Sequence, residues 1–80
     1  MVDINLWSGL RRFTNDQTVV SVQARTIREM LDALTKAHPA LSPVIKSGVS
    51  VAVNGQIVTD LNAIVDPTAE VYLIQRIKGG

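Results

Sequence analysis

The residues that most clearly suggest a chemical role are two consecutive glycines, Gly79 and Gly80, which follow Arg76, Ile77 and Lys78. We call residues 76–80 the tail. Glycine has no side chain to pack in a core. A carboxylate carried on two glycines can pass through a narrow channel and meet an activating enzyme without steric hindrance. The alternative is a frayed end, since chain termini are often disordered. The functional interpretation therefore requires a rigid body that holds the tail out.

The other side chains do not form a set typical of an enzyme. The sequence has no cysteine and a single histidine, His38, which argues against disulfides, a thiolate metal site and a multi-histidine site. No Ser/His/Asp set and no glycine-rich phosphate loop is present. We therefore expect no intrinsic catalytic residue, no metal and no bound cofactor.

Length and composition predict one small globular domain. The 80 residues suffice for a modest core, and the apolar fraction of 46% is typical of a folded chain. A formal net charge of +1 argues against bulk nucleic-acid binding. No apolar run has the length of a membrane span, and no signal-peptide pattern opens the sequence. We expect a cytoplasmic protein that binds neither nucleic acid nor membranes.

One helix is strongly predicted in the middle of the chain. Thr26 and Glu29 have the spacing of a capping box, in which the threonine hydroxyl and the glutamate satisfy free amide groups. The apolar residues that follow have helical spacing on one face: Ile27, Met30, Leu31 and Leu34. Pro39 prevents continuation, so the helix is expected from about Thr26 to Ala37.

Short segments on both sides of this helix have the patterns of β-strands. They span residues 2–7, 18–23, 49–53, 56–58 and 70–75. The strand positions predicted to face the core are Val2, Ile4, Leu6, Val20, Val22, Val71 and Leu73. The sequence Asn54-Gly55 is the preferred two-residue type I′ turn between two strands. The first two strands are expected to form an antiparallel hairpin.

The order of these elements predicts an α+β roll. One main helix packs on one face of a mixed four- to five-stranded sheet, and the crossing helix requires some parallel pairing. Helical turns are also expected at residues 40–47 and 60–63, and a further turn at residues 66–68. We assign residues 1–75 to the folded domain and residues 76–80 to a flexible tail.

The sheet face away from the helix is a candidate partner-binding surface. If Val71 and Leu73 point toward the helix, Tyr72 and Ile74 point away from it. Such an exposed apolar pair is either a docking patch or ordinary cross-strand packing. Trp7 shares the outward parity and either extends this patch or covers an edge of the sheet. Arg11 and Arg12 are expected in a solvated loop.

These motifs, taken in order, resemble the ThiS/MoaD group of sulfur carriers, which have the ubiquitin-like β-grasp fold. The matching segments are Thr26 to Leu34, His38-Pro39-Ala40-Leu41, Val53-Asn54-Gly55-Gln56, Asp66-Pro67, Glu70 to Ile74 and Gly79-Gly80. These segments are distributed from Thr26 to Gly80, and the resemblance extends across nearly the whole chain.

The resemblance implies a carrier that is the substrate of other enzymes. An adenylating enzyme would use ATP to convert the Gly80 carboxylate to an acyl-adenylate. A sulfur donor would then displace AMP and leave a thiocarboxylate at Gly80. A downstream synthase would accept this sulfur for a cofactor, a tRNA base or a metabolite. The chain has no nucleophile or general base for these steps, so activation comes from outside.

The residues before the diglycine depart from the usual sulfur-carrier pattern. Such carriers have small or apolar residues there, whereas Arg76 and Lys78 are closer to the R-L-R-G-G end of ubiquitin. This departure indicates an acidic groove on a partner, and it keeps open a ubiquitin-like modifier joined to proteins through Gly80. A third hypothesis is an interaction module in which the tail has no role.

Overall fold

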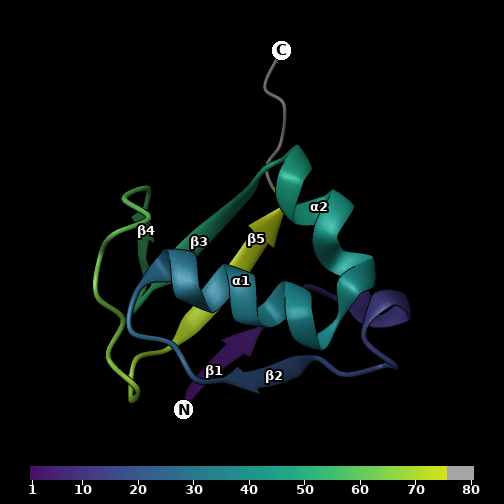
Figure 1. The fold of residues 1–80 in the computed structure, drawn as a ribbon, viewed down its shortest axis with the longest axis horizontal. Helices are drawn as coiled ribbons and strands as arrows, with labels where there is room; N and C mark the ends of the chain where they lie inside the picture. Colours follow the sequence, from purple (N-terminus) through teal and green to yellow (C-terminus); the bar gives the residue numbers. More distant parts are fainter. Residues whose placement is uncertain (76–80) are drawn as a thin grey trace.

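The structure is a computed structural model that describes residues 1–75. These residues form one sheet and its covering helices (Figure 1). The strands are β1 (Val2–Asn5), β2 (Val19–Val22), β3 (Val49–Val53), β4 (Gln56–Val58) and β5 (Val71–Gln75). The helices are η1 (Ser8–Phe13), α1 (Ile27–Ala37), η2 (Pro39–Leu41) and α2 (Ser42–Ser47). No helix within residues 1–75 is long and apolar enough to cross a membrane.

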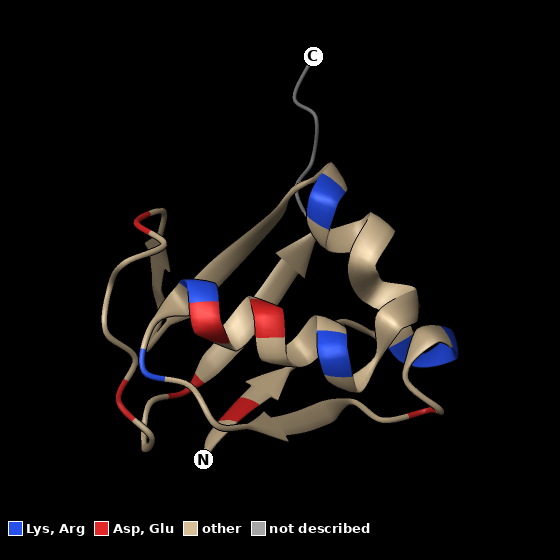
Figure 2. Cartoon of the chain, viewed as in Figure 1, with Lys and Arg blue, Asp and Glu red and all other residues tan. Residues whose placement is uncertain are grey.

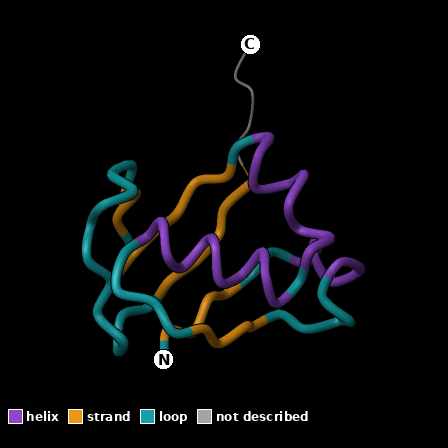
Figure 3. Tube along the Cα trace, in the orientation of Figure 1, coloured by secondary structure: helices purple, strands orange, loops and turns teal. Residues whose placement is uncertain are grey.

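The five strands form a single mixed sheet in the order β2-β1-β5-β3-β4. β1 pairs with β5 in parallel, whereas β1–β2, β3–β4 and β3–β5 are antiparallel. The expected hairpins and the expected parallel pairing are confirmed. β5, the last strand in the sequence, lies at the centre of the sheet with hydrogen-bonded neighbours on both sides. Helix α1 crosses one face of this sheet (Figure 3).

The core lies between α1 and that face. Ile27, Met30 and Leu34 of the helix are at most 1% exposed, while Leu31 is half-buried. Every strand position predicted to face inward is buried: Val2, Ile4, Leu6, Val20, Val22, Val71 and Leu73. Leu10 and Leu41 close the core beside η1 and η2. The alternation in the sequence therefore assigned the two sheet faces correctly.

Helix α1 begins as the capping box predicts, with one difference. The Thr26 hydroxyl accepts a hydrogen bond from the Glu29 amide at 3.2 Å. The Glu29 carboxylate accepts from the amide of Arg25 at 2.9 Å, one residue before the cap. The first turn of the helix is thus tied to the segment that enters it.

The loop between β4 and β5 satisfies two further amides of this helix end. The amides of Ile27 and Arg28 donate to the carbonyl oxygens of Ala63 and Leu61, at 3.1 and 2.9 Å. These amides have no partner within the helix. The loop is consequently fixed against α1 just before the chain enters β5.

Turn residues set the remaining connections. Asn54 and Gly55 have φ angles of 51° and 84°, the positive values that a type I′ turn requires. At residues 60–63, where a helical turn was expected, the Ala63 amide donates to the Asp60 carbonyl oxygen and the Asn62 amide to the Asp60 carboxylate, which gives a single turn and no helix. Before β5, the hydroxyl and amide of Thr68 both donate to Asp66, and these bonds lower the pKa of the Asp66 carboxyl.

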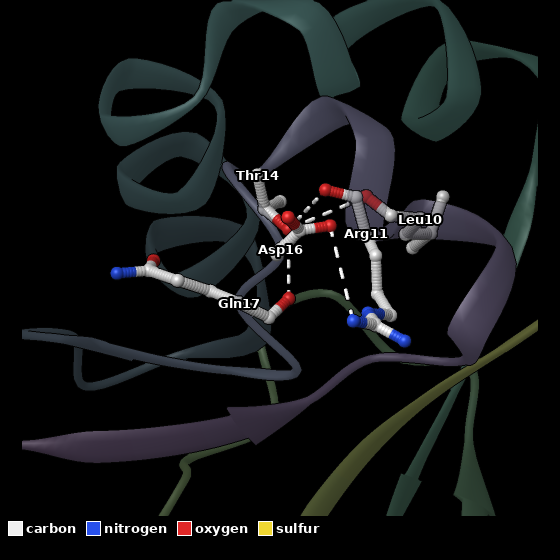
Figure 4. A network of polar contacts seen from close by, with 5 residues as sticks. All are labelled: Leu10, Arg11, Thr14, Asp16 and Gln17. Carbon is white, nitrogen blue, oxygen red and sulfur yellow. Dashed lines mark hydrogen bonds and ion pairs between the residues drawn. The ribbon is translucent and has the colours of Figure 1, made fainter.

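The segment between β1 and β2 was expected to be a solvated loop; Arg11 and Arg12 are indeed exposed, but they lie on a short helix. Residues 8–13 form the 3-10 helix η1, and Arg11 lies 3.9 Å from the Asp16 carboxylate (Figure 4). Thr14, completely buried, donates its hydroxyl proton to the Gln17 carbonyl oxygen at 2.7 Å. The carbonyl oxygens of Leu10 and Arg11 lie 3.3 and 3.4 Å from the same hydroxyl. One side chain thus fixes the corner between η1 and β2.

We expect Thr14→Val to lower the free energy of unfolding by about 1–3 kcal/mol, because the shape is kept but buried carbonyl groups lose their donor. Thr14→Ser retains the hydroxyl and is the matched control, with a smaller loss. Urea unfolding of the three proteins measures both effects. Equal stability of Thr14→Val and the parent chain would contradict this role.

Candidate functional site

The central strand β5 leads directly into the tail. Its last residue, Gln75, is also the last residue that the structure describes. The predicted tail residues Arg76, Ile77, Lys78, Gly79 and Gly80 lie outside the described residues. The site can therefore be built from the surfaces around β5 that any protein acting on the tail would meet.

The first of these surfaces is the sheet face opposite α1, which we call the open face. Tyr72 is 46% exposed and Ile74 is 40% exposed, whereas Val71 and Leu73 are buried. The predicted orientation of both outward side chains is confirmed. Tyr72 and Ile74 lie on the same face of one strand, so the structure brings these two candidate partner-binding residues together.

The strand register extends this surface across the whole sheet. Tyr72 is paired with Asn5 on β1 and with Ala52 on β3. The next partners outward are Val19 on β2 and Ile57 on β4, which are 45% and 57% exposed. These five residues form one row, the Tyr72 row, in which a small buried alanine separates Tyr72 from Ile57.

Sequence reasoning missed Val19 and Ile57, although part of the signal was available. The two-residue turn at Asn54-Gly55 fixes the pairing of Ala52 with Ile57 from sequence alone. The alternation that directs Val20 inward likewise directs Val19 outward. Their alignment with Tyr72 was not accessible, because it depends on pairing between strands far apart in the sequence.

Trp7 lies away from the Tyr72 row, at the end of the sheet where β5 finishes. The indole is half-buried against the core, and it lines a groove together with Gln75. A Cβ atom at Gly9 would lie 3.1 Å from Nε1 of Trp7, so this glycine lets the ring lie against η1. Trp7 therefore does not extend the Tyr72 row, and it is half-buried beyond the end of β1 rather than over an edge strand.

Charges are distributed unevenly around these surfaces (Figure 2). Arg11 and Arg12 lie on η1, and Lys46 lies in the last turn of α2, near the end of β5. The loop that precedes β5 carries Asp60 and Asp66. The end of the sheet from which the tail departs is therefore the cationic one.

Comparison with known proteins identifies the family. Residues 4–80 match the model described as the ThiS family. The chain belongs to the ThiS family. The match spans almost the whole chain, including Gly79 and Gly80. No curated protein matches the chain.

Solved structures share the fold at low sequence identity. A chain of the BexX/CysO complex of Amycolatopsis orientalis has a TM-score of 0.80 at 20% identity, with 100% of both chains covered. SAMP1 of Haloferax volcanii has a TM-score of 0.73 at 26% identity, covering 99% of this chain and 98% of SAMP1. A chain from the complex of subunits 1 and 2 of the molybdopterin-converting factor of Helicobacter pylori 26695 has a TM-score of 0.70 at 16% identity, covering 99% and 97%.

The predicted family and fold are confirmed by these comparisons. The ThiS-family chain is a ubiquitin-like β-grasp protein of the sulfur-carrier type. It is accordingly a carrier protein, and the surfaces around β5 are its candidate site.

Substitutions on the two faces of β5 are expected to lower stability by unequal amounts. We expect Leu73→Ala to lower the free energy of unfolding by about 2–5 kcal/mol, because it creates a cavity in the core. Tyr72→Ser removes an exposed side chain and cross-strand contacts, so we expect a loss of about 1 kcal/mol or less. Urea unfolding of both variants measures the difference, and a larger loss for Tyr72→Ser would argue against a free open face.

Proposed function

We propose that this ThiS-family protein carries sulfur as a thiocarboxylate at Gly80. A partner enzyme adenylates the Gly80 carboxylate: a carboxylate oxygen attacks the α-phosphorus of ATP, and pyrophosphate leaves. Hydrosulfide released by a sulfur donor then attacks the acyl carbon, and AMP leaves with that oxygen, so that the thiocarboxylate forms without a change in oxidation state. A downstream synthase accepts the sulfur. The carrier itself binds no cofactor in this scheme.

The observation that carries this proposal is the position of β5. A strand held on both sides at the centre of the sheet ends at Gln75, and the family match continues to Gly80. Five extended residues span at most about 17 Å. That reach allows the acyl carbon to enter a partner's active site while the folded body stays at its mouth.

We further propose that the open face is the docking surface for the adenylating enzyme. Tyr72 and Ile74 are exposed apolar residues on the strand that precedes the tail, so one partner can contact both surface and tail. Exposed tyrosines are frequent among the residues that dominate binding energy. The similar BexX/CysO and molybdopterin-converting-factor structures are complexes of two proteins, which supports a protein partner. Because adenylation consumes ATP, we place the protein in the cytoplasm.

A second candidate function is a protein modifier joined through Gly80 to lysine side chains. Arg76 and Lys78 favour it, as does the likeness to SAMP1, a small archaeal modifier protein. Both functions pass through the same acyl-adenylate and differ in whether sulfur or a lysine amine displaces AMP.

Mass spectrometry distinguishes the two candidates. After co-expression with an adenylating enzyme that acts on ThiS-family carriers and with a sulfur donor, we expect the intact chain to gain the mass of one sulfur in exchange for one oxygen. A chain lacking Gly80 is the matched control and should show no exchange. Adenylation without exchange, together with Gly-Gly remnants on cellular lysines, would favour the modifier. The absence of both products would contradict a role of Gly80.

Steady-state kinetics of the adenylating enzyme test the docking surface. We expect the double variant Tyr72→Ser/Ile74→Ser to raise KM for the carrier by about tenfold or more, as for truncated interface anchors, with little change in kcat. Ile64→Ser is the matched control, because Ile64 is 84% exposed but lies in the loop before β5 and outside the Tyr72 row. An equal effect of both changes would exclude specific docking through the open face.

A further inference from the structure

A groove at the end of β5 is not used by the function proposed above. It has a volume of about 690 Å³ and lies between η1 and α2. Trp7, Phe13 and Val44 supply apolar walls, each half-buried against the core. Gln75 also lines the groove, so it opens directly beside the point where the tail begins.

Arg12 is the charged residue among those that line this groove. Its guanidinium carbon lies 5.1 Å from the centroid of the Phe13 ring, a cation–π contact that limits the freedom of the side chain. Within residues 1–75 the ion pair present is between Arg11 and Asp16, so Arg12 forms none there. The guanidinium is thus oriented by an aromatic wall and retains donors for a ligand.

The lining of the groove carries one cation and no acidic residue among the residues that the structure describes. Arg11, the neighbour of Arg12 on η1, is already paired with Asp16, and Lys46 of α2 lines a separate hollow together with Asp32 and Lys36. Arg12 is thus the cation available to a ligand in this groove. Apolar walls beside a single guanidinium suit a segment in which a carboxylate neighbours a bulky apolar side chain.

We propose that this groove binds an acidic segment of a protein partner. One carboxylate of the segment pairs with the Arg12 guanidinium, and a neighbouring aliphatic or aromatic side chain enters between Trp7 and Val44. This proposal depends on the proposed function in one respect only, namely that the partner is a protein that acts on the tail. Such a segment would lie beside Gln75 and hold the partner at the base of the tail, independently of the open face.

A peptide titration tests the groove without any adenylating enzyme, so its outcome does not depend on chemistry at Gly80. The probe is the acetylated, amidated peptide Glu-Leu-Glu-Phe-Glu, and the same peptide with glutamine in place of glutamate is its neutral control. Trp7 is the single tryptophan, so both its fluorescence and its indole NMR signal report on the groove. We expect saturable binding of the acidic peptide that shifts the Trp7 indole and the Gly48 amide but not the Tyr72 amide.

Charge variants identify the recognising residue. We expect Arg12→Gln to weaken binding by about fivefold, the upper range for a partly exposed ion pair. Arg11→Gln is the matched control, because Arg11 already pairs with Asp16, and it should leave affinity nearly unchanged. Both arginines are exposed, so the variants should fold, which their unchanged amide spectra would verify.

Each of the following results would overturn the proposal. They are absence of saturable binding, equal affinity for the neutral peptide, equal affinity of the Arg12→Gln variant, and shifts centred on Tyr72 instead of Trp7. Binding of free 3-phenylpropanoate as tightly as the peptide would likewise replace the protein partner by a small carboxylate. None of these results bears on the proposed thiocarboxylate at Gly80, which the mass-spectrometry experiment tests separately.

Discussion

Burial of a single helical stripe against the sheet is the interaction on which this structure depends. Ile27, Met30 and Leu34 have almost no exposed surface, and they contact a sheet face made of equally buried strand residues. An 80-residue chain without cysteine has no disulfide with which to supplement this core. One main helix covers one face of the sheet. The open face is thus a direct consequence of how few residues the chain has for covering layers.

Hydrogen bonds in the connecting segments support β5 from both ends of the sheet. The loop before β5 is tied to the first turn of α1 through the carbonyl groups of Leu61 and Ala63. At the other end, the Thr14 hydroxyl fixes the corner between η1 and β2. Helix η1 contains Arg11, Arg12 and Gly9, the glycine against which the Trp7 ring lies. Hydrogen bonds at both ends of the sheet thus fix the segments that flank β5.

The sequence predicted the elements whose signals are local. The spacing from Ile27 to Leu34, the cap at Thr26 and the turn at Asn54-Gly55 each depend on residues a few positions apart. The inward and outward sides of β5 also follow from alternation alone, which is why the exposure of Tyr72 was predictable. Such local patterns predict the fold class and which face of each strand is buried.

Features that depend on distant pairing were beyond this reasoning. The Tyr72 row requires the parallel pairing of β1 with β5 and the antiparallel pairing of β5 with β3, which no local pattern encodes. The helix η1 has too few turns for a periodic signal, so Arg12 was assigned to a solvated loop and the groove was missed. The reach of Glu29 to Arg25 reflects the path of the entering chain, which the capping-box spacing does not specify.

The central position of β5 has a mechanical meaning. A pull on the tail is directed along β5, which is paired with β3 along its whole length and with β1 at Val71 and Tyr72. The hydrogen bonds of the β3 ladder are then loaded in shear. Extraction of β5 also removes Val71 and Leu73 from the core, so the first strand to feel the force is the one whose loss unfolds the molecule. The body is consequently a firm anchor for whatever chemistry is performed on its end.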